Sequence, residues 1–269
     1  MTLQQKVVGG SVSFDNAADI YDATRALAPE VAAKQTEALL TELRARGTDR
    51  LLEIGIGTGR IARPLMERGV RVTGVDLAPR MMQRLRDQLT PRHTAPDLAY
   101  ADATRLPLRD DAFQAILMVH VLHLVSDWRA TVAEMLRVLA PGGAFFHDVT
   151  QYPGENPGRF GWNRRKALFA KHGITTRPRP DPEQIVQALR DAGGSQRIVV
   201  YAEHEERNTV RTIVDNLRNR IDSSTWEVPS DIHEAFADDF EASCIQEFGD
   251  LDQEYAVKAQ YTLEVWTFA

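Results

Sequence analysis

The chain has 269 residues, enough for one large domain or for one domain with a small cap. Hydrophobic residues make up 43% of it and charged residues 26%, as in ordinary globular proteins, and the net charge of −6 argues against a general attraction to nucleic-acid phosphates. The single cysteine, Cys244, excludes an internal disulfide framework and fits a reducing compartment.

The first predicted element is a long helix near the N-terminus, within residues 28–47. A proline near its start and a glycine just past its end are the punctuation expected of a helix. Four apolar residues at helical spacing can share one face of it. They are Val31, Leu39, Leu40 and Leu43.

Strands and helices then alternate up to residue 150. Short apolar runs predict strands, and several of the longer segments between them carry apolar residues at helical spacing. This alternation predicts an α/β fold in which a parallel sheet has helices on both faces. The expected strands are 50–54, 70–76, 97–102, the start of 111–125 and 143–150, and the expected helices are 58–69, 78–89 and 127–143.

The alternation breaks after residue 150. Residues 151–180 are rich in proline and glycine, which indicates a long irregular connection or a cap. Their aromatic residues and those of 205–250 could line an apolar pocket, or could simply be core. The later expected elements are a helix at 181–193, a strand at 196–204, helical segments at 208–221 and 230–248, and a strand at 256–267.

Two parts of the chain are expected from this pattern. Residues 1–150 would form the core with its N-terminal helices. Residues 151–269 would complete the sheet around an inserted substrate cap of about 151–180 and 205–250.

Charge is unevenly placed in the second half. Residues 159–180 carry seven Lys or Arg and no acid, and residues 227–254 carry ten Asp or Glu and no base. One interpretation is two solvated faces that partly neutralise each other. The other is a mobile cap whose basic limb meets an anionic group of a substrate.

The stretch "LLEIGIGTGR" at residues 51–60 is the first candidate for a binding site. Glycines stand at 55, 57 and 59, directly behind a predicted strand that contains Glu53. Glycine suits backbone that turns sharply or lies against a ligand. The dinucleotide fingerprint is G-x-G-x-x-G, and here Arg60 occupies the place of its third glycine. Because a carboxylate beside the loop repels a pyrophosphate, we expect a nucleoside-like, positively charged ligand without phosphates.

Two further carboxylates follow predicted strands. Asp76 ends the second strand, about 20 residues after the glycines, where an acid binds both hydroxyls of a ribose. Asp102 ends the predicted third strand, where it can accept a hydrogen bond from an adenine amino group. In an open α/β sheet ligands bind at the carboxyl ends of the strands, so these acids are expected at one site.

These motifs resemble those of the class I S-adenosylmethionine-dependent methyltransferases over residues 14–150. "LLEIGIGTGR" is similar to the first motif, "VDLAP" to the second-strand acid, "ADATRLPLRDDAFQAI" to the third- and fourth-strand block and "LRVLAPGGAFF" to the run into strand five. "FDNAADIYDATR" is similar to the N-terminal segment of the branch that includes quinone and natural-product methyltransferases.

The resemblance implies a Rossmann-like three-layer sandwich. Its seven-stranded, mostly parallel sheet would have an antiparallel last strand, with a helical cap added. The cofactor would be S-adenosyl-L-methionine and the product S-adenosyl-L-homocysteine. The methionine end would lie by Tyr21 and Arg25, its amine by Glu53, Gly55 and Gly57, the ribose by Asp76, and the adenine by Asp102 and Ala103. The further cofactor-binding residues expected on this basis are Thr58, Gly59, Leu77, Met81, Val119 and His120.

The acid–base residues are left open. His120 and His123 follow the predicted fourth strand, and His147 lies near the end of the fifth. Each imidazole could accept a proton from an acceptor hydroxyl, or could be structural, His123 most of all. Asp148 could orient such a base or merely cap a loop. The spacing of these groups does not suggest a metal site.

The resulting expectation is a methyltransferase that acts on an O, N or C nucleophile of a small molecule. A protein that senses S-adenosylmethionine without turnover is the alternative, and a nucleic-acid methyltransferase is less favoured because of the net charge. A nicotinamide oxidoreductase is disfavoured by the glycine spacing and Glu53. We expect no membrane partner and a cytoplasmic location, because no apolar run approaches about 20 residues and the start lacks the features of a signal peptide.

Overall fold

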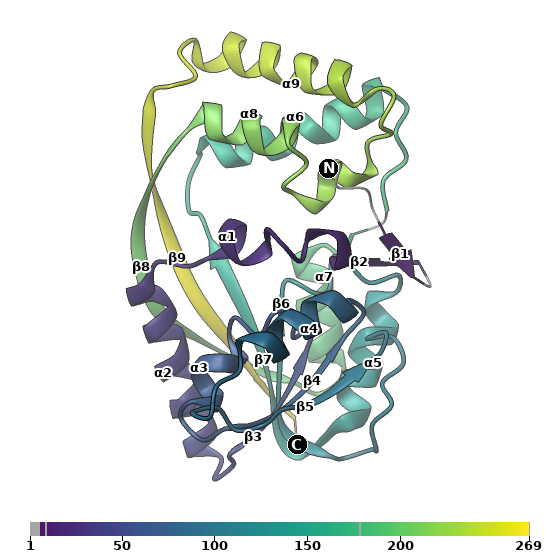
Figure 1. Cartoon of the computed structure of the whole chain (residues 1–269), viewed down its shortest axis with the longest axis vertical. Coiled ribbons are helices and arrows are strands. Elements are labelled where there is room, and N and C mark those ends of the chain that lie inside the picture. The colour runs from purple at the N-terminus through teal and green to yellow at the C-terminus, as the bar shows by residue number, and fades with distance from the viewer. Residues whose placement is uncertain (1–5, 9, 178, 269) are drawn as a thin grey trace. The chain divides into compact units, whose positions relative to one another are not determined.

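The computed structural model describes residues 6–8, 10–177 and 179–268, and the chain divides into two compact units (Figure 1). The larger unit contains Lys6–Thr150, Arg179–Ala202 and residues 261–268. The smaller unit contains residues 151–177 and Glu203–Gln260. Each unit has its own hydrophobic core and is described separately below.

A seven-stranded sheet forms the centre of the larger unit. Parallel pairing joins neighbouring strands through the middle of the sheet, and in the central pair Glu53 lies opposite Gly74. The strands are, in sheet order, β5 (Asp97–Tyr100), β4 (Arg71–Asp76), β3 (Arg50–Ile54), β6 (Phe113–Val119), β7 (Leu139–Gln151), β9 (Glu254–Thr267) and β8 (Ser195–Thr209).

The last strand, β9, is antiparallel to the strands on either side of it. The Thr262 hydroxyl donates to the Val149 carbonyl at 3.0 Å, and the Phe268 N–H donates to the Gly143 carbonyl. The partner number therefore falls along β9 as it rises along β7. These bonds confirm the predicted seven-stranded, mostly parallel sheet with an antiparallel last strand.

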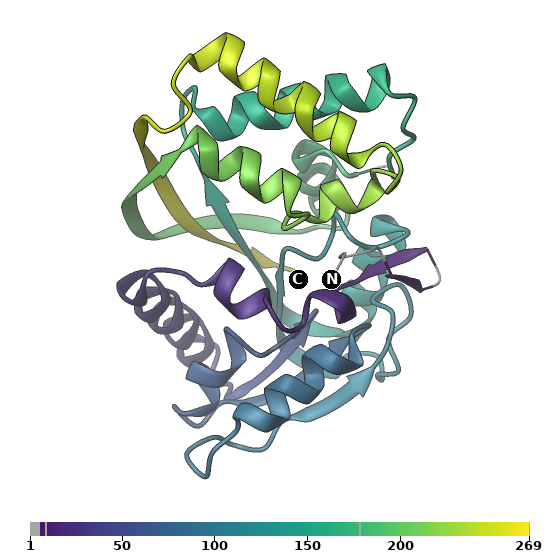
Figure 2. The same ribbon diagram turned by 45° about the horizontal axis from the view of Figure 1, so that its top comes forward.

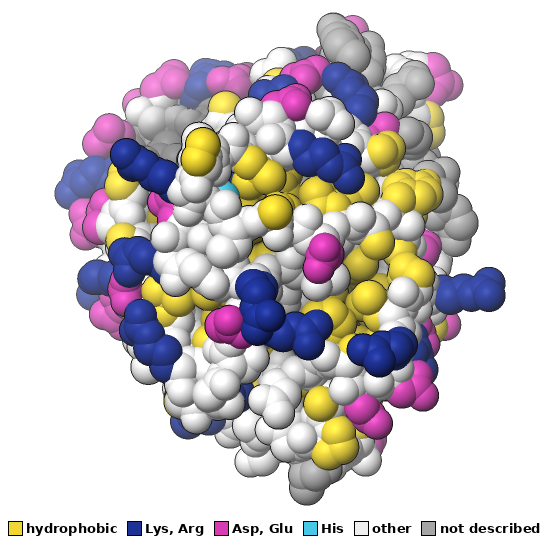
Figure 3. All heavy atoms as spheres, turned by 60° about the horizontal axis from the view of Figure 1, so that its bottom comes forward, with side chains coloured by type: hydrophobic (Ala, Val, Ile, Leu, Met, Phe, Trp, Pro, Cys, Tyr) yellow, Lys and Arg dark blue, Asp and Glu magenta, His cyan; other side chains and the backbone are white. Residues whose placement is uncertain are grey.

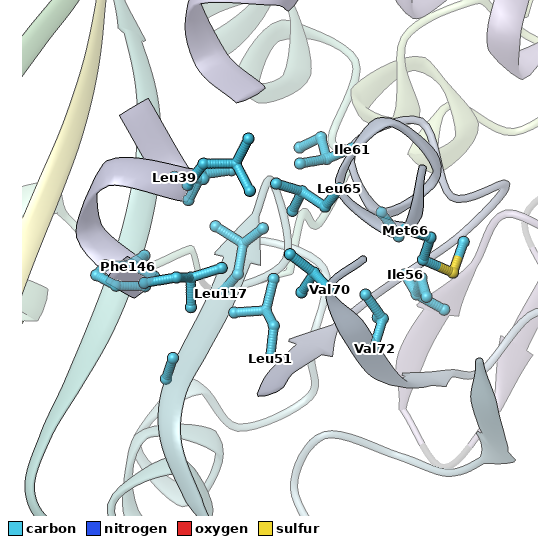
Figure 4. Close-up of a cluster of buried hydrophobic side chains, with 14 of the residues drawn as sticks. Leu39, Leu51, Ile56, Ile61, Leu65, Met66, Val70, Val72, Leu117 and Phe146 are labelled. Atoms are coloured by element: carbon cyan, nitrogen blue, oxygen red, sulfur yellow. The ribbon is translucent and has the colours of Figure 1, made fainter. Parts of the chain in front are cut away.

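Helices cover both faces of the sheet and complete the three-layer sandwich. One face packs against α2 (Pro29–Ala45), α3 (Ala62–Met66) and α4 (Pro79–Gln88). Figure 4 shows the side chains of this cluster pointing toward one another between the helices and the strands. The other face packs against α5 (Trp128–Val138) and α7 (Pro182–Asp191). Burying each Leu, Ile or Phe side chain of these layers contributes roughly 1.5–3 kcal/mol.

The N-terminal helix α2 follows its predicted amphipathic pattern. Pro29 occupies the first turn, where its missing N–H leaves no hydrogen bond unmade. All four apolar residues predicted for its inner face, which are Val31, Leu39, Leu40 and Leu43, are buried. The following helix differs from expectation in length, because α3 spans only five of the residues 58–69.

The helix expected at 127–143 ends earlier than predicted. Helix α5 stops at Val138, and β7 begins at Leu139. Leu139 pairs with Phe113 of β6, with a shift of register before Ala115. The Pro-Gly signal read as a helix end therefore lies inside an irregular first part of β7, where pairing with β6 overrides the local pattern.

Three helices pack together in the smaller unit. They are α6 (Pro157–Lys171), α8 (Val210–Arg218) and α9 (His233–Phe248), which lie side by side in Figures 1 and 2. Their inner faces bury Leu168, Phe236 and Phe240 completely or nearly so. A short 3-10 helix, η2 (Ser223–Glu227), follows α8 and was not predicted.

The irregular connection expected over residues 151–180 is wrong for its central part, which is helix α6. Asn156 caps this helix by accepting a hydrogen bond from the Arg159 N–H at 3.0 Å, and Pro157 fills its first position. Gly161 faces α8 and α9, and a Cβ there would lie 3.2 Å from Ile213. The proline and glycine that suggested irregularity therefore serve the start and the packing of a helix.

The two oppositely charged segments of the second half pair with each other within the smaller unit. Lys171 Nζ lies 2.6 Å from the Asp239 carboxylate, and Arg177 Nε lies 3.0 Å from the Glu227 carboxylate. These contacts favour the first interpretation of the charge pattern, partial mutual neutralisation. Being largely at the surface, the first of them adds little to stability.

Candidate active site

In the loop between β3 and α3, every residue with a positive φ is a glycine. Gly55, Gly57 and Gly59 all have positive φ, at +81°, +55° and +71°. Other residues rarely adopt this backbone conformation. A Cβ on Gly55 would also collide with the Val121 side chain, which packs directly against this glycine. The Gly55 N–H donates to the Val75 carbonyl and the Gly59 N–H to the Ile56 carbonyl, so internal hydrogen bonds hold the turn in its shape.

Glu53 brings a buried carboxyl group to this loop. The residue is 3% exposed, and its Oε2 has no hydrogen-bond partner among the described residues. Burial raises the pKa of Glu53 to about 8, against the opposing effect of the Arg60 guanidinium and with a further rise from Asp76. An unpaired buried polar atom is costly in a folded protein. A cationic ligand group at this position would remove that cost, so the loop fits the ammonium group of a methionine moiety.

Asp76 closes the loop from the end of β4. Its two oxygens accept hydrogen bonds from the Gly57 N–H at 2.7 Å and the Ala78 N–H at 2.8 Å. Burial raises the pKa of Asp76 to about 6, although these backbone donors lower it. A carboxylate offers about four lone-pair positions, so these backbone donors leave part of its acceptor capacity for a ligand. Such a carboxylate can accept from two neighbouring hydroxyls.

Asp102 is held by the chain on both sides. Its Oδ1 accepts from the Thr104 N–H at 2.9 Å, and its Oδ2 accepts from the Ser11 hydroxyl at 3.0 Å. Ser11 belongs to β2 (Ser11–Ser13), which pairs with β1 (Lys6–Val8) in a small separate sheet. Ala103 beside it is buried. The sequence pattern did not indicate this link to the N-terminus.

The N-terminal segment is fastened to the same edge of the sheet. It contains η1 (Asp15–Ala17) and α1 (Tyr21–Arg25). The Thr58 hydroxyl donates to the Asp22 carboxylate at 2.5 Å, and the Ser13 hydroxyl donates to the Leu77 carbonyl at 3.2 Å. Met81 is buried in a small cluster with Ala18 and Ala78, against which Tyr21 packs. Helix α1 is thereby tied to the glycine loop and to the segment after β4.

Tyr21 and Arg25 share an electrostatic environment with the loop carboxylates. Burial raises the pKa of Tyr21, while the Arg60 and Arg25 guanidinium groups oppose the rise and Asp76 and Glu53 add to it. The structure thus brings Tyr21, Arg25, Glu53 and Asp76 together. Arg60 is an additional member of this group, and only its position in the glycine motif could have indicated it.

His120 follows β6 in a strained position. Its φ is +55°, which is uncommon for a residue other than glycine, and its ring centroid lies 6.4 Å from that of His123. Burial lowers the pKa of His120 to about 4, and Arg60, His147 and Arg25 lower it further. His120 is therefore neutral near pH 7 and a weak base. Val119 before it pairs with Asp148 in the sheet.

His147 is oriented by a residue that the sequence did not single out. Its Nδ1 lies 3.0 Å from the Glu264 carboxylate of β9, and its ring stacks on Phe145. Glu264 is separated from it by 117 residues, so only the tertiary fold joins the two. The one available signal was a single acid within the apolar final strand. A carboxylate on Nδ1 fixes the tautomer and leaves Nε2 as the proton acceptor.

Asp148 does not orient His147, as was considered possible from their adjacency. Successive side chains of a strand point to opposite faces. The Asp148 carboxylate instead accepts from the Tyr201 hydroxyl at 3.2 Å, and the Gln35 amide reaches that hydroxyl at 3.3 Å. Burial raises the pKa of Asp148. Among residues 10–177 and 179–268, no group of three or more His, Cys, Asp or Glu side chains could hold a metal ion.

Comparison with known proteins identifies the family of the chain. The family described as "Methyltransferase domain" matches residues 52–147, from the end of β3 to β7. A malonyl-[acyl-carrier protein] O-methyltransferase from Serratia marcescens is 37% identical over 131 residues, which are 49% of this chain and 48% of that protein. The chain spans about half the length of several curated relatives that it matches.

Two further proteins extend the comparison. The YcgJ protein from Bacillus subtilis has the same fold, with a TM-score of 0.57, 18% identity and coverage of 86% of this chain and 97% of that one. An uncharacterized methyltransferase from Mycobacterium bovis is 32% identical over 181 residues, which are 66% of this chain and 68% of that protein. With the glycine loop, the strand-end acids and the sheet order, these similarities show that the chain belongs to the class I S-adenosylmethionine-dependent methyltransferase family.

Proposed function

We propose that the chain transfers a methyl group from S-adenosylmethionine to an O, N or C nucleophile of a small molecule. The observation that carries this proposal is the buried carboxyl of Glu53, whose Oε2 has no partner among the described residues, beside a loop whose three glycines have positive φ. That pair suits a ligand with an ammonium group and no phosphate. Membership of the methyltransferase family supports the same assignment.

The proposed roles follow the order of the strands. Glu53, Gly55 and Gly57 would hold the methionine amine, with Tyr21 and Arg25 at the same end. Asp76 would accept from the ribose hydroxyls, and Asp102 with Ala103 would lie at the adenine. The second group of expected contacts is Thr58, Gly59, Leu77, Met81, Val119 and His120.

In methyl transfer the main contribution of the site residues is to align the two reactants. The bound cofactor supplies a sulfonium methyl carbon, and after transfer the electron pair of the broken C–S bond stays on the sulfur of S-adenosylhomocysteine. The residues of the site hold both reactants in line and exclude water, which can contribute about 7–11 kcal/mol. A proton acceptor for the nucleophile adds about 10² to 10⁴ in rate.

Calorimetric titration with S-adenosylmethionine, S-adenosylhomocysteine and NAD tests the cofactor directly. We expect micromolar binding of the first two and no heat from NAD. An acceptor screen that measures S-adenosylhomocysteine then separates an enzyme from a sensor. Binding of NAD alone, or of none of the three, would contradict the proposal. Tight binding without product for any acceptor class would favour the sensor.

The face drawn in Figure 3 gives no support to a nucleic-acid acceptor. Figure 3 shows Lys and Arg side chains in small groups on one face, separated by apolar and uncharged surface and accompanied by Asp and Glu. A nucleic-acid-binding face usually gathers basic side chains into a patch or stripe. This face is consistent with the small-molecule acceptor proposed above. No helix of the described chain has the length and apolar character needed to span a bilayer.

His147 is the proposed proton acceptor. The variant His147→Ala should lower kcat by about 10²- to 10⁴-fold for an acceptor that must lose a proton, because Nε2 takes that proton. Cofactor affinity should change little, since His147 is not assigned to cofactor contacts. The measurement is initial-rate kinetics with calorimetric titration of the cofactor.

Two further variants test whether the loss of kcat in His147→Ala is specific to the proposed proton acceptor. Glu264→Gln should lower kcat less than His147→Ala, because the amide can still accept from Nδ1 and hold the ring in place. His204→Ala, in the smaller unit, is the matched control and should leave kcat unchanged. Full activity of His147→Ala together with loss in His120→Ala would transfer the role to His120.

A further inference from the structure

A cavity of about 590 Å³ lies wholly within the smaller unit. Its walls come from the first turns of α6, the end of β8, the start of α8 and the start of β9. Trp162, Tyr152, Tyr255 and Ile213 form much of its apolar surface. Cavities of this size, mostly apolar with a few polar groups, are typical of sites for small organic ligands.

Two aromatic side chains of the cavity remain exposed at energetic cost. Tyr152 is 43% exposed and Trp162 is 36% exposed, and both are among the few large apolar side chains that the described residues leave open to solvent. By contrast, the nearby Phe236 and Phe240 are fully buried in the core. Exposed aromatic surface gathered in a concavity indicates a ligand that covers it.

The charged groups that line the cavity are mainly carboxylates, and its amides and hydroxyls can both donate and accept hydrogen bonds. Glu206 and Asp222 contribute carboxylates, and Asn208 and Asn216 contribute side-chain amides. Burial and the Glu206 carboxylate raise the pKa of Tyr152 to about 12, so its hydroxyl, 3.4 Å from Glu206, keeps its proton. This surface favours a ligand that donates hydrogen bonds.

An anionic ligand finds little support in the same surface. Arg159 is the single cation among the described lining residues, and it already lies 3.4 Å from the Glu155 carboxylate. Asp222 accepts from the buried Arg165 at 3.0 Å, which places that cation behind the carboxylate. A ligand carboxylate or phosphate would therefore be repelled by two protein carboxylates, and the one lining cation is already paired with another acid.

We infer that this cavity binds a planar ring compound carrying a hydroxyl or amine group. The rings of Trp162, Tyr152 and Tyr255 cover the ring of the ligand, and the carboxylates and amides accept from its donor group. Compounds that present a free carboxylate or phosphate are excluded as good ligands.

The test compares three indoles that share one ring and differ in the terminal group. They are tryptophol, tryptamine and indole-3-propionate, each titrated calorimetrically into the full chain. We expect the alcohol and the amine to bind at least about tenfold more tightly than the carboxylate, a difference of about 1.4 kcal/mol. Equal affinities, tighter binding of the carboxylate, or no binding of any of the three would overturn the inference.

Variants locate the binding and test the charge argument. Trp162→Ala should weaken tryptamine binding at least about tenfold, and Trp162→Phe should recover most of it. Glu206→Gln should reduce the preference for the amine over the carboxylate. Glu205→Gln is the matched control, because it is the neighbouring acid of β8 and does not line the cavity. Tyr100→Ala removes an exposed aromatic of the larger unit and should have no effect.

The cofactor titration keeps this inference separate from the proposed function. Binding of S-adenosylmethionine without the expected indole preference would overturn the inference and leave the methyltransferase proposal intact. The indole preference without cofactor binding would overturn the methyltransferase proposal and confirm a ligand site in the smaller unit. Circular dichroism of each variant shows that lost binding is not lost folding.

Discussion

Asp76→Ala should reduce the affinity for S-adenosylmethionine at least about 100-fold. In the proposed complex the carboxylate accepts from both ribose hydroxyls, and each hydrogen bond to a charged group contributes about 1.5–3 kcal/mol. The change also removes the acceptor of the Gly57 and Ala78 N–H groups, which hold the glycine loop against the end of β4. Calorimetric titration of the variant at pH 7.5 measures the loss.

A graded series separates the two effects of that change. Asp76→Asn keeps one oxygen that can accept from the loop, so it should bind more tightly than Asp76→Ala and more weakly than the native chain. Asp49→Ala is the control, because Asp49 lies at the other end of the sheet in an exposed ion pair with Arg71. It should leave cofactor affinity unchanged. Unchanged affinity of Asp76→Ala would remove Asp76 from the ribose site.

The parts of the site that could be predicted from the sequence are those fixed by local rules. Glycine at alternate positions after an apolar run specifies a turn with positive φ, and the three observed φ values follow that pattern. Acids that end parallel strands reach one edge of the sheet because the strands run in the same direction. Glu53, Asp76 and the glycine loop therefore come together without any long-range information.

The parts that could not be predicted depend on contacts between distant segments. The His147–Glu264 pair joins β7 to β9, and Ser11 reaches Asp102 across 91 residues. Helix α6 was missed for a different reason. Its proline and Gly161 resemble breakers until the neighbouring helices α8 and α9 are in place, when the missing side chain of Gly161 allows close packing against Ile213 and Phe240. That packing cannot be predicted from the amino-acid composition of residues 151–180 alone.

We expect the protonated carboxyl of Glu53 to stabilise the fold and the ionised carboxylate to bind the cofactor amine. The pKa of its carboxyl is raised from 4.5 to about 8 by burial, so the folded chain holds a proton that the unfolded chain releases. The stability that this proton contributes is fully present below pH 4.5. It is lost as the pH rises toward 8, at about 1.4 kcal/mol per pH unit.

Glu53→Gln should remove that loss, because the amide imitates the protonated carboxyl and does not titrate. The variant should melt at a higher temperature than the native chain at pH 8.5, and the difference should shrink toward pH 5. Thermal unfolding of the two proteins without cofactor, at matched ionic strength, measures it. Glu37→Gln, which alters an exposed ion pair with Arg68, should show no such trend. A constant difference across this range would mean that Glu53 is ionised in the folded chain.

The same substitution should abolish most cofactor binding, although it stabilises the chain without ligand. A cationic amine binds the carboxylate form, so its binding must expel the proton from Glu53 below pH 8. The native chain should therefore release close to one proton per cofactor bound at pH 7, seen as a dependence of the calorimetric heat on the ionisation enthalpy of the buffer. Affinity should rise with pH up to about 8 and then level. Proton-neutral binding at pH 7 would place the amine elsewhere, and Glu53 would then be a structural acid whose burial is balanced by Arg60 alone.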